Sequence, residues 1–159
     1  MAGIAHRSGD PRAARALLEG RLAICRKLGV SDLLVHALGA MGNLERDEGD
    51  YPRARALYQE SLRLRQELGS LFALAQSLED LAALAGREQQ WERAVRLLGA
   101  AEAFCETLGA RPPVAVASEY ERTVAEGRAA LGEAAFAAAW AEGRAMALEQ
   151  AVEYALGGA

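Results

Sequence analysis

The stretch GDYPRARALYQESLRLRQELGS (residues 49–70) decides the fold, because a close copy of it, GDPRAARALLEGRLAICRKLGV, occupies residues 9–30. Shifting the sequence by 40 residues aligns 9–48 with 49–88 and gives thirteen identical positions. A third, weaker copy begins at Gln89, where QQWERAVRLL stands in place of GDYPRARALY. Self-similarity at a fixed period of roughly 20–50 residues indicates a repeat architecture.

Each copy carries the start and stop signals of helices. Asp10 and Asp50 precede the helical pattern and can accept a hydrogen bond from a free backbone N–H of the first turn. Glycine follows leucine at residues 29, 69 and 109, which is the place for a left-handed C-terminal cap. We therefore predict that each copy contains helices with defined ends.

Between these signals, apolar residues recur every three or four positions, which is helical periodicity. No segment has the alternation of a strand. The predicted helices cover residues 11–28, 32–47, 51–68, 71–87, 91–108, 114–131, 133–143 and 147–156. The predicted fold is all-α, a solenoid of antiparallel helix pairs that bury their apolar faces on their neighbours.

The repeated residues resemble the tetratricopeptide repeat. With Val35 as position one, small and large packing residues of that family match Leu38, Met41, Gly42, Ala54, Tyr58 and Ser61, and the turn matches Gly49, Asp50 and Tyr51. With Ala75 as position one, the equivalents are Leu78, Leu81, Ala82, Trp91, Ala94, Leu98 and Ala101. The resemblance implies a right-handed α-solenoid with TPR-like repeats over residues 1–109 (a partial helix over 1–8, then repeats of about 40 residues) and C-terminal capping helices over 110–159.

The longer period and the segment 96–156 resemble the C-terminal repeat region of bacterial signalling ATPases and transcriptional regulators of the AfsR/MalT/LuxR type. The resemblance implies a scaffold or sensory segment that binds a protein or peptide. A second function left open is an inducer-sensing domain that binds a small ligand. The chain carries no phosphate-binding loop and no evident helix-turn-helix, so the ATPase and DNA-binding activities of such proteins are not assigned to it.

Composition limits the function classes. The formal charge of −4 argues against direct nucleic-acid binding, which needs a basic face. No apolar run approaches the roughly 18 residues of a membrane span, and the first residues lack the pattern of a signal peptide, so we expect a cytoplasmic protein. No motif for a catalytic centre, a metal or a cofactor is present, and we expect no enzyme activity.

Two sets of residues are candidates for partner binding. First helices line the concave surface in the tetratricopeptide family, which places a candidate groove at His36, Gly39, Asn43, Glu79, Ala83 and Arg87. The second set is a candidate interface. The short segment 1–8 is expected to leave Leu17, Leu18 and Ile24 partly uncovered. Either further residues precede this segment and cover them, or, if the chain is complete, we expect a homodimer through an open N-terminal end. In the C-terminal cap, Phe136, Trp140 and Tyr154 are either packing anchors or a partner-binding patch.

Overall fold

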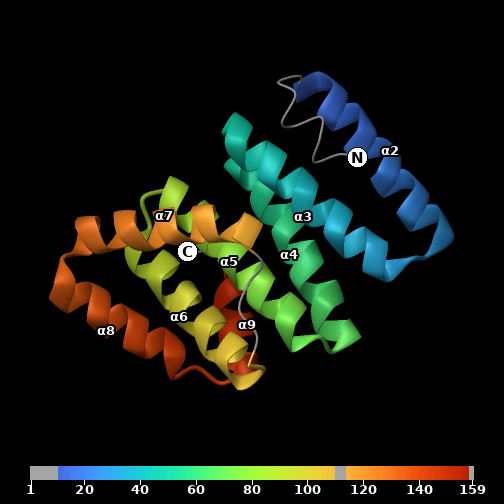
Figure 1. The fold of residues 1–159 in the computed structure, drawn as a ribbon. Helices are drawn as coiled ribbons and strands as arrows, with labels where there is room; N and C mark the ends of the chain where they lie inside the picture. The colour runs from blue at the N-terminus through green and yellow to red at the C-terminus, as the bar shows by residue number, and fades with distance from the viewer. Residues whose placement is uncertain (1–10, 110–113, 158–159) are drawn as a thin grey trace. The chain divides into compact units, whose positions relative to one another are not determined.

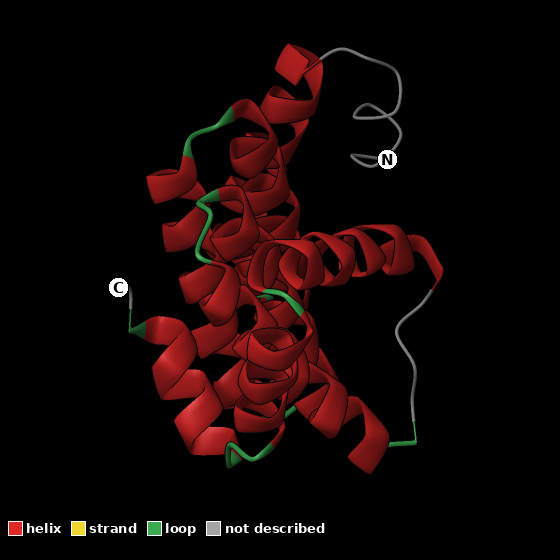
Figure 2. Ribbon diagram, turned by 90° about the vertical axis from the view of Figure 1, so that its left-hand side faces the viewer, coloured by secondary structure: helices red, strands yellow, loops and turns green. Residues whose placement is uncertain are grey.

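A computed structural model describes residues 11–109 and 114–157 of the 159-residue chain. Within these ranges every regular element is a helix, and the connections that lie wholly within them are short (Figure 2). The helices are α2 (Pro11–Leu28), α3 (Ser31–Glu48), α4 (Tyr51–Leu68), α5 (Leu71–Arg87), α6 (Trp91–Thr107), α7 (Val114–Leu131), α8 (Glu133–Arg144) and α9 (Leu148–Leu156) (Figure 1). The predicted all-α fold is confirmed, and the predicted helix bounds differ by one residue where they differ.

The predicted helix ends are also present. The Asp50 carboxylate accepts a hydrogen bond from the Arg53 N–H at 3.1 Å, which caps α4. Gly29, Gly69 and Gly109 have φ values of 66°, 69° and 61°, the left-handed conformation that glycine adopts most easily. Asp10 lies outside the described residues.

The chain divides into two compact units, residues 1–67 and 68–159. In the N-terminal unit, Leu18 and Leu22 of α2 pack against Leu38 and Met41 of α3 in one apolar core. The Glu45 carboxylate lies in this unit, buried, and Arg15 of α2 binds it through two N–H···O bonds of 2.5 and 2.9 Å. The N-terminal unit is therefore held by leucine packing and by an ion pair between successive helices.

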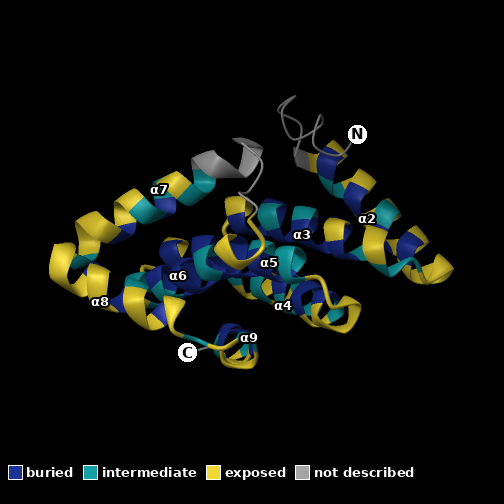
Figure 3. Cartoon of the chain, turned by 60° about the horizontal axis from the view of Figure 1, so that its bottom comes forward, coloured by how far each residue is buried: buried dark blue, intermediate teal, exposed yellow. Residues whose placement is uncertain are grey.

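In the C-terminal unit, the backbones of α8 and α6 come close together at two glycines, Gly99 and Gly143. A Cβ placed on Gly99 would fall 2.5 Å from the Trp140 carbonyl oxygen, and one placed on Gly143 would fall onto the backbone of Arg96. Figure 3 shows that α8 carries both buried and exposed residues along its length. Glycine is required at this crossing because any larger residue would separate the helices.

Arg93 of α6 makes two contacts with the last helix. Arg93 donates a hydrogen bond to the Ala155 carbonyl oxygen at 3.1 Å, and its guanidinium lies 5.0 Å from the centre of the Tyr154 ring. Both contacts are made at the C-terminal end of α9, where carbonyl groups lack helical partners.

Candidate functional site

The candidate groove residues of the N-terminal unit lie on α3, and their accessibility differs. His36 is exposed, whereas Gly39 is buried and cannot contact a partner directly. Asn43 is half-buried, and its Oδ1 accepts a hydrogen bond of 2.6 Å from the Tyr58 hydroxyl. Placing Gly39 on a groove surface is therefore wrong, and Asn43 supports the packing of α3 on α4.

The candidate groove residues of the C-terminal unit lie on α5. Ala83 is buried, so its placement on an accessible surface is also wrong. Arg87 is exposed at the end of the helix, and its guanidinium lies 3.9 Å from the Glu119 carboxylate of α7. The six candidates thus divide between the two units, and His36 and Arg87 are the exposed ones.

Glu79 is the most unusual of the six. Glu79 is only 7% exposed to solvent. Its buried Oε2 has no hydrogen-bond partner. Burial, with a smaller contribution from the neighbouring Asp80 charge, raises the pKa of Glu79 to about 7. Burial also raises the pKa of the Cys105 thiol, and the Glu79 and Glu102 charges raise it further. Cys105 is therefore held as a thiol and lacks the thiolate character of a reactive cysteine.

The candidate interface residues of α2 separate into two kinds. Leu17 and Ile24 are 53% and 61% exposed. Leu18 is 4% exposed and packs in the core of the N-terminal unit, so the expectation that it is uncovered is wrong. The physical reason is the helical period, because Leu18 follows Leu17 by one residue and points about 100° away from it.

The aromatic residues of the cap act mainly as packing anchors. Phe136 is 5% exposed and packs with Val95 and Ala139, so it is not a surface residue. Trp140 is half-buried and stacks on Phe136, with ring centroids 5.4 Å apart and an angle of 22° between the rings. Tyr154 lies elsewhere in the unit, beneath the Arg93 guanidinium.

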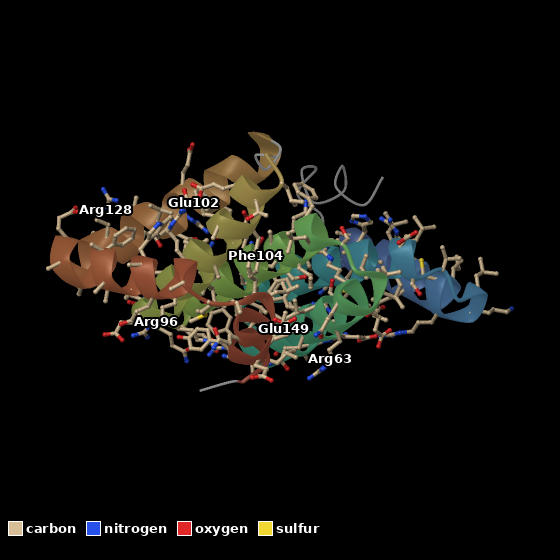
Figure 4. The ribbon with its side chains drawn as sticks, turned by 90° about the horizontal axis from the view of Figure 1, so that it is seen from below. Arg63, Arg96, Glu102, Phe104, Arg128 and Glu149 are labelled. Carbon is tan, nitrogen blue, oxygen red and sulfur yellow. The ribbon has the colours of Figure 1, made fainter. Side chains whose placement is uncertain are left out.

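Beside this aromatic stack, a cavity of about 470 Å³ opens between α6, α7 and α8. A cavity of this size falls in the range of small-ligand pockets. Its lining residues are Glu102, Tyr120, Val124, Arg128, Glu133, Phe136, Ala137 and Trp140. We call it the α6–α8 pocket; Figure 4 labels two of its charged residues, Glu102 and Arg128.

The charged groups of the α6–α8 pocket are arranged around the aromatic stack. The Arg128 guanidinium lies 4.6 Å from the centre of the Phe136 ring, and its Nε lies 3.6 Å from the Glu133 carboxylate. Arg144 binds the Glu102 carboxylate at 2.9 Å and the Glu106 carboxylate at 2.6 Å. The Arg144 hydrogen bond lowers the pKa of Glu106. The pocket therefore combines aromatic rings with two carboxylates, Glu102 and Glu133, each of which contacts an arginine.

The described residues offer little for other chemistry. They contain no group of three or more His, Cys, Asp or Glu side chains that could hold a metal ion. Over the same ranges, no helix is both long enough and apolar enough to cross a membrane. Cys25 and Cys105 are both buried and free.

Comparison with known families matches the tetratricopeptide repeat to residues 1–67 and, overlapping, to 33–107. This chain is a tetratricopeptide repeat protein. The match covers about two thirds of the 159 residues and ends at the last residue of α6. Comparison with curated proteins and comparison with solved structures each gave no match.

Membership of the tetratricopeptide repeat family explains the close contact of α3 and α4. A Cβ on Gly42 would fall 2.5 Å from the Tyr58 ring, so the small residue of the first helix makes room for the large residue of the second. The Ser61 hydroxyl donates to the Val35 carbonyl oxygen at 3.2 Å across the same helix pair. These are the packing positions that the repeat pattern identified.

Sequence reasoning missed the α6–α8 pocket as a site. It singled out Phe136 and Trp140, but not Glu102, Tyr120, Arg128 or Glu133. The aromatic pair four residues apart was a visible signal for one wall. The other walls come from helices up to 38 residues away in sequence and outside the repeat pattern, so periodicity could not assign them.

Proposed function

We propose that this tetratricopeptide repeat protein is a protein-interaction module that serves as a sensory or regulatory segment of a bacterial transcriptional regulator. The observation that supports it is the family match over residues 1–107, because the repeat is an architecture for binding proteins and peptides. The regulatory role is favoured by the long repeat period and by the segment 96–156. We place the module in the cytoplasm.

The proposed contact surface in the N-terminal unit is one face of α3. Leu33 and His36 are exposed, and Ala40 and Asn43, spaced four and three residues further on, are half-buried. Residues three or four apart share one face of a helix, so these side chains form a continuous stripe. An apolar and a polar exposed residue side by side suit the recognition of a peptide.

The test is selection of peptides from a random library against the folded chain, followed by calorimetric titration of a selected peptide. We expect His36→Ala to weaken binding about tenfold, the cost of removing a well-placed contact. The control is Arg63→Ala, which removes a side chain that is also exposed, but from α4. Failure to enrich any shared motif, or equal affinity of the His36→Ala variant, would contradict the proposal. Asn43 is left unchanged because its loss would leave the Tyr58 hydroxyl without its acceptor.

The α6–α8 pocket favours a second function, sensing of a small ligand by the same module. A ligand that binds the native state alone raises the melting temperature. A thermal-shift screen of metabolites checks this alternative. A hit should lose its effect when Trp140 is replaced by alanine, and a screen without a dose-dependent shift would argue against sensing.

We further propose that the chain forms a homodimer through α2. Leu17, Ile24 and Leu28 are all more than half exposed, and their spacing of seven and four residues places them on one side of the helix. Light scattering at micromolar concentration should give the mass of a dimer. Replacing Leu17 and Ile24 with glutamate should give a monomer, and a monomeric parent protein would refute the proposal.

A further inference from the structure

We propose that the α6–α8 pocket receives an arginine side chain of the protein partner. This inference rests on the proposed protein-binding function and names the chemistry of one contact. Most residues of the pocket lie in the C-terminal helices, beyond the repeats that the family match covers. The pocket therefore lies largely outside the matched repeats.

The first argument is charge. The pocket lining holds two carboxylates, Glu102 and Glu133, and one guanidinium, Arg128, which leaves one net negative charge. Glu102 uses one oxygen to bind Arg144, and a carboxylate can accept about four hydrogen bonds. The Glu133 side chain is 77% exposed and carries one long contact to Arg128. Both carboxylates can therefore accept further N–H donors.

The second argument is the aromatic surface. Tyr120, Phe136 and Trp140 line the pocket, and the faces of aromatic rings attract cations. The pocket shows this property already, since the Arg128 guanidinium lies over the Phe136 ring at 4.6 Å. A planar guanidinium can stack on such a ring and bind carboxylates at its edge at the same time, which a lysine ammonium cannot do. The observed Arg128 contact thus favours arginine over lysine in the partner.

Arg128 itself then acts as an internal competitor. Its side chain is 52% exposed, and its contacts are the stacking on the Phe136 ring and a long ion pair of 3.6 Å to Glu133, both of which a second guanidinium could replace. An incoming arginine can displace it from the Phe136 ring and take over the Glu133 carboxylate. Removing the Arg128 charge should therefore strengthen the binding of a cation, which is the opposite of the effect expected for an anionic ligand.

The experiment uses the full chain and the blocked tripeptide acetyl-Ala-Arg-Ala-amide, followed by NMR of the two tryptophan indole N–H groups. Trp140 lines the pocket, and Trp91, the other tryptophan, does not and reports any global change. The same tripeptide with citrulline in place of arginine keeps the planar shape but carries no charge and has three N–H donors where arginine has five. We expect the Trp140 resonance to shift to saturation in the millimolar range, and the citrulline peptide to bind about tenfold more weakly.

Two variants complete the test. Arg128→Ala should bind the arginine peptide about threefold more tightly, and Glu133→Gln about threefold more weakly. A stationary Trp140 resonance, equal binding of the citrulline peptide, or weaker binding by Arg128→Ala would each overturn the proposal.

The result of the tripeptide test can be distinguished from the result of the peptide-selection test of the proposed function. The His36→Ala test concerns α3 of the N-terminal unit, whereas the tripeptide test concerns the C-terminal unit. Loss of peptide binding in His36→Ala with a stationary Trp140 would refute the arginine pocket alone. A shifted Trp140 without any selected peptide motif would leave the pocket standing and refute the α3 surface.

Discussion

The helix pairs α3–α4 and α5–α6 are successive copies of one repeat, but different residues pack between the two helices of each pair. In the first pair, Gly42 faces Tyr58, whose hydroxyl bonds to Asn43. In the second, the same two positions hold Ala82 and Leu98, both buried. From the first pair to the second, the residue on the first helix becomes larger and the residue on the second helix becomes smaller. The difference teaches that the repeat fixes the space shared by two positions and leaves open which side chain fills it.

The two units also differ in the contacts that arginine side chains make between their helices. In the N-terminal unit, Glu45 accepts from Arg15 and from Arg53, whose Nε lies 3.0 Å away. Forty residues later the equivalents are Ala85 and Arg93, and Arg93 instead holds the end of α9. The C-terminal unit adds the backbone contact at Gly99 and Gly143. An arginine at one repeat position therefore serves an ion pair in one unit and a helix end in the other.

The largest effect is expected from a substitution that breaks the backbone contact between α6 and α8. Gly143→Ala places a methyl group on the Arg96 backbone, which cannot move away without shifting α6. We expect a loss of about 3 kcal/mol in the free energy of unfolding, at the upper end for overpacking. Urea denaturation measures it.

The control for Gly143→Ala is the same substitution in the N-terminal unit. Gly20 lies in α2, and a Cβ there would meet no atom within 4 Å. Gly20→Ala should therefore stabilise the protein by about 0.5–1 kcal/mol through helix propensity. Equal effects of the two substitutions would show that the α6–α8 contact is not close.

The second effect concerns Glu79, which occupies the position of Gly39 in the other pair. Its pKa of about 7 in the folded state lies above the ordinary glutamate value of about 4.5. The folded state therefore binds the proton more tightly, and stability falls as pH rises from about 4.5 through 7. The whole loss is about 3 kcal/mol, since one pKa unit corresponds to about 1.4 kcal/mol.

Glu79→Gln removes the charge and should flatten stability across this pH range. At pH 8 the free energy of unfolding of the variant should exceed that of the parent by about 2–3 kcal/mol. Glu153→Gln, at an exposed position of α9, serves as the control. An unchanged pH dependence in Glu79→Gln would mean that the buried carboxyl is solvated in the folded chain.

The sequence predicted most of the fold because the repeat is local. Helix bounds, the Asp50 cap and the glycine turns all depend on residues within one helix or its ends. Three of the six groove candidates are buried, and Glu79 is one of them. The burial of the other two, Gly39 and Ala83, has a different cause. Both are small residues on first helices, and periodicity shows that a residue shares a face with its neighbours without showing how closely the next helix covers that face.

The α6–α8 pocket lay beyond prediction for a related reason. Its position depends on the approach of α8 to α6, which is set by Gly99 and Gly143. A glycine within a helix pattern reads as a weak helix former, and its role as a contact between two backbones appears only when both helices are placed. Glu79 shows the same limit, because a glutamate on a first helix reads as solvated until its burial is known.

The third effect exchanges packing residues between the two pairs. Gly42→Ala places a methyl group against the buried Tyr58 ring and should destabilise the protein by about 1–2 kcal/mol. Adding Tyr58→Leu reproduces the Ala82 and Leu98 arrangement and should restore part of that loss. The measurement is a double-mutant cycle by thermal or urea denaturation, with an expected coupling of about 1 kcal/mol. Additive effects would show that the two positions do not share one space.

The smallest effect tests the turns that begin the second helices. Gly49 has a φ of 88° before α4, and the equivalent Gln89 before α6 has a φ of 61°, the one non-glycine residue with positive φ in the described ranges. A side chain in the left-handed region costs roughly 1 kcal/mol. The Gln89 side chain offsets part of this cost, because its Oε1 accepts a hydrogen bond of 3.2 Å from the Trp91 indole N–H. That contact is exposed and contributes about 0.5 kcal/mol. Gln89→Gly should therefore stabilise the chain by about 0.5 kcal/mol, measured by urea denaturation. A destabilised variant would mean that the bond to Trp91 outweighs the backbone strain, and that glutamine is at this turn to hold Trp91 in place.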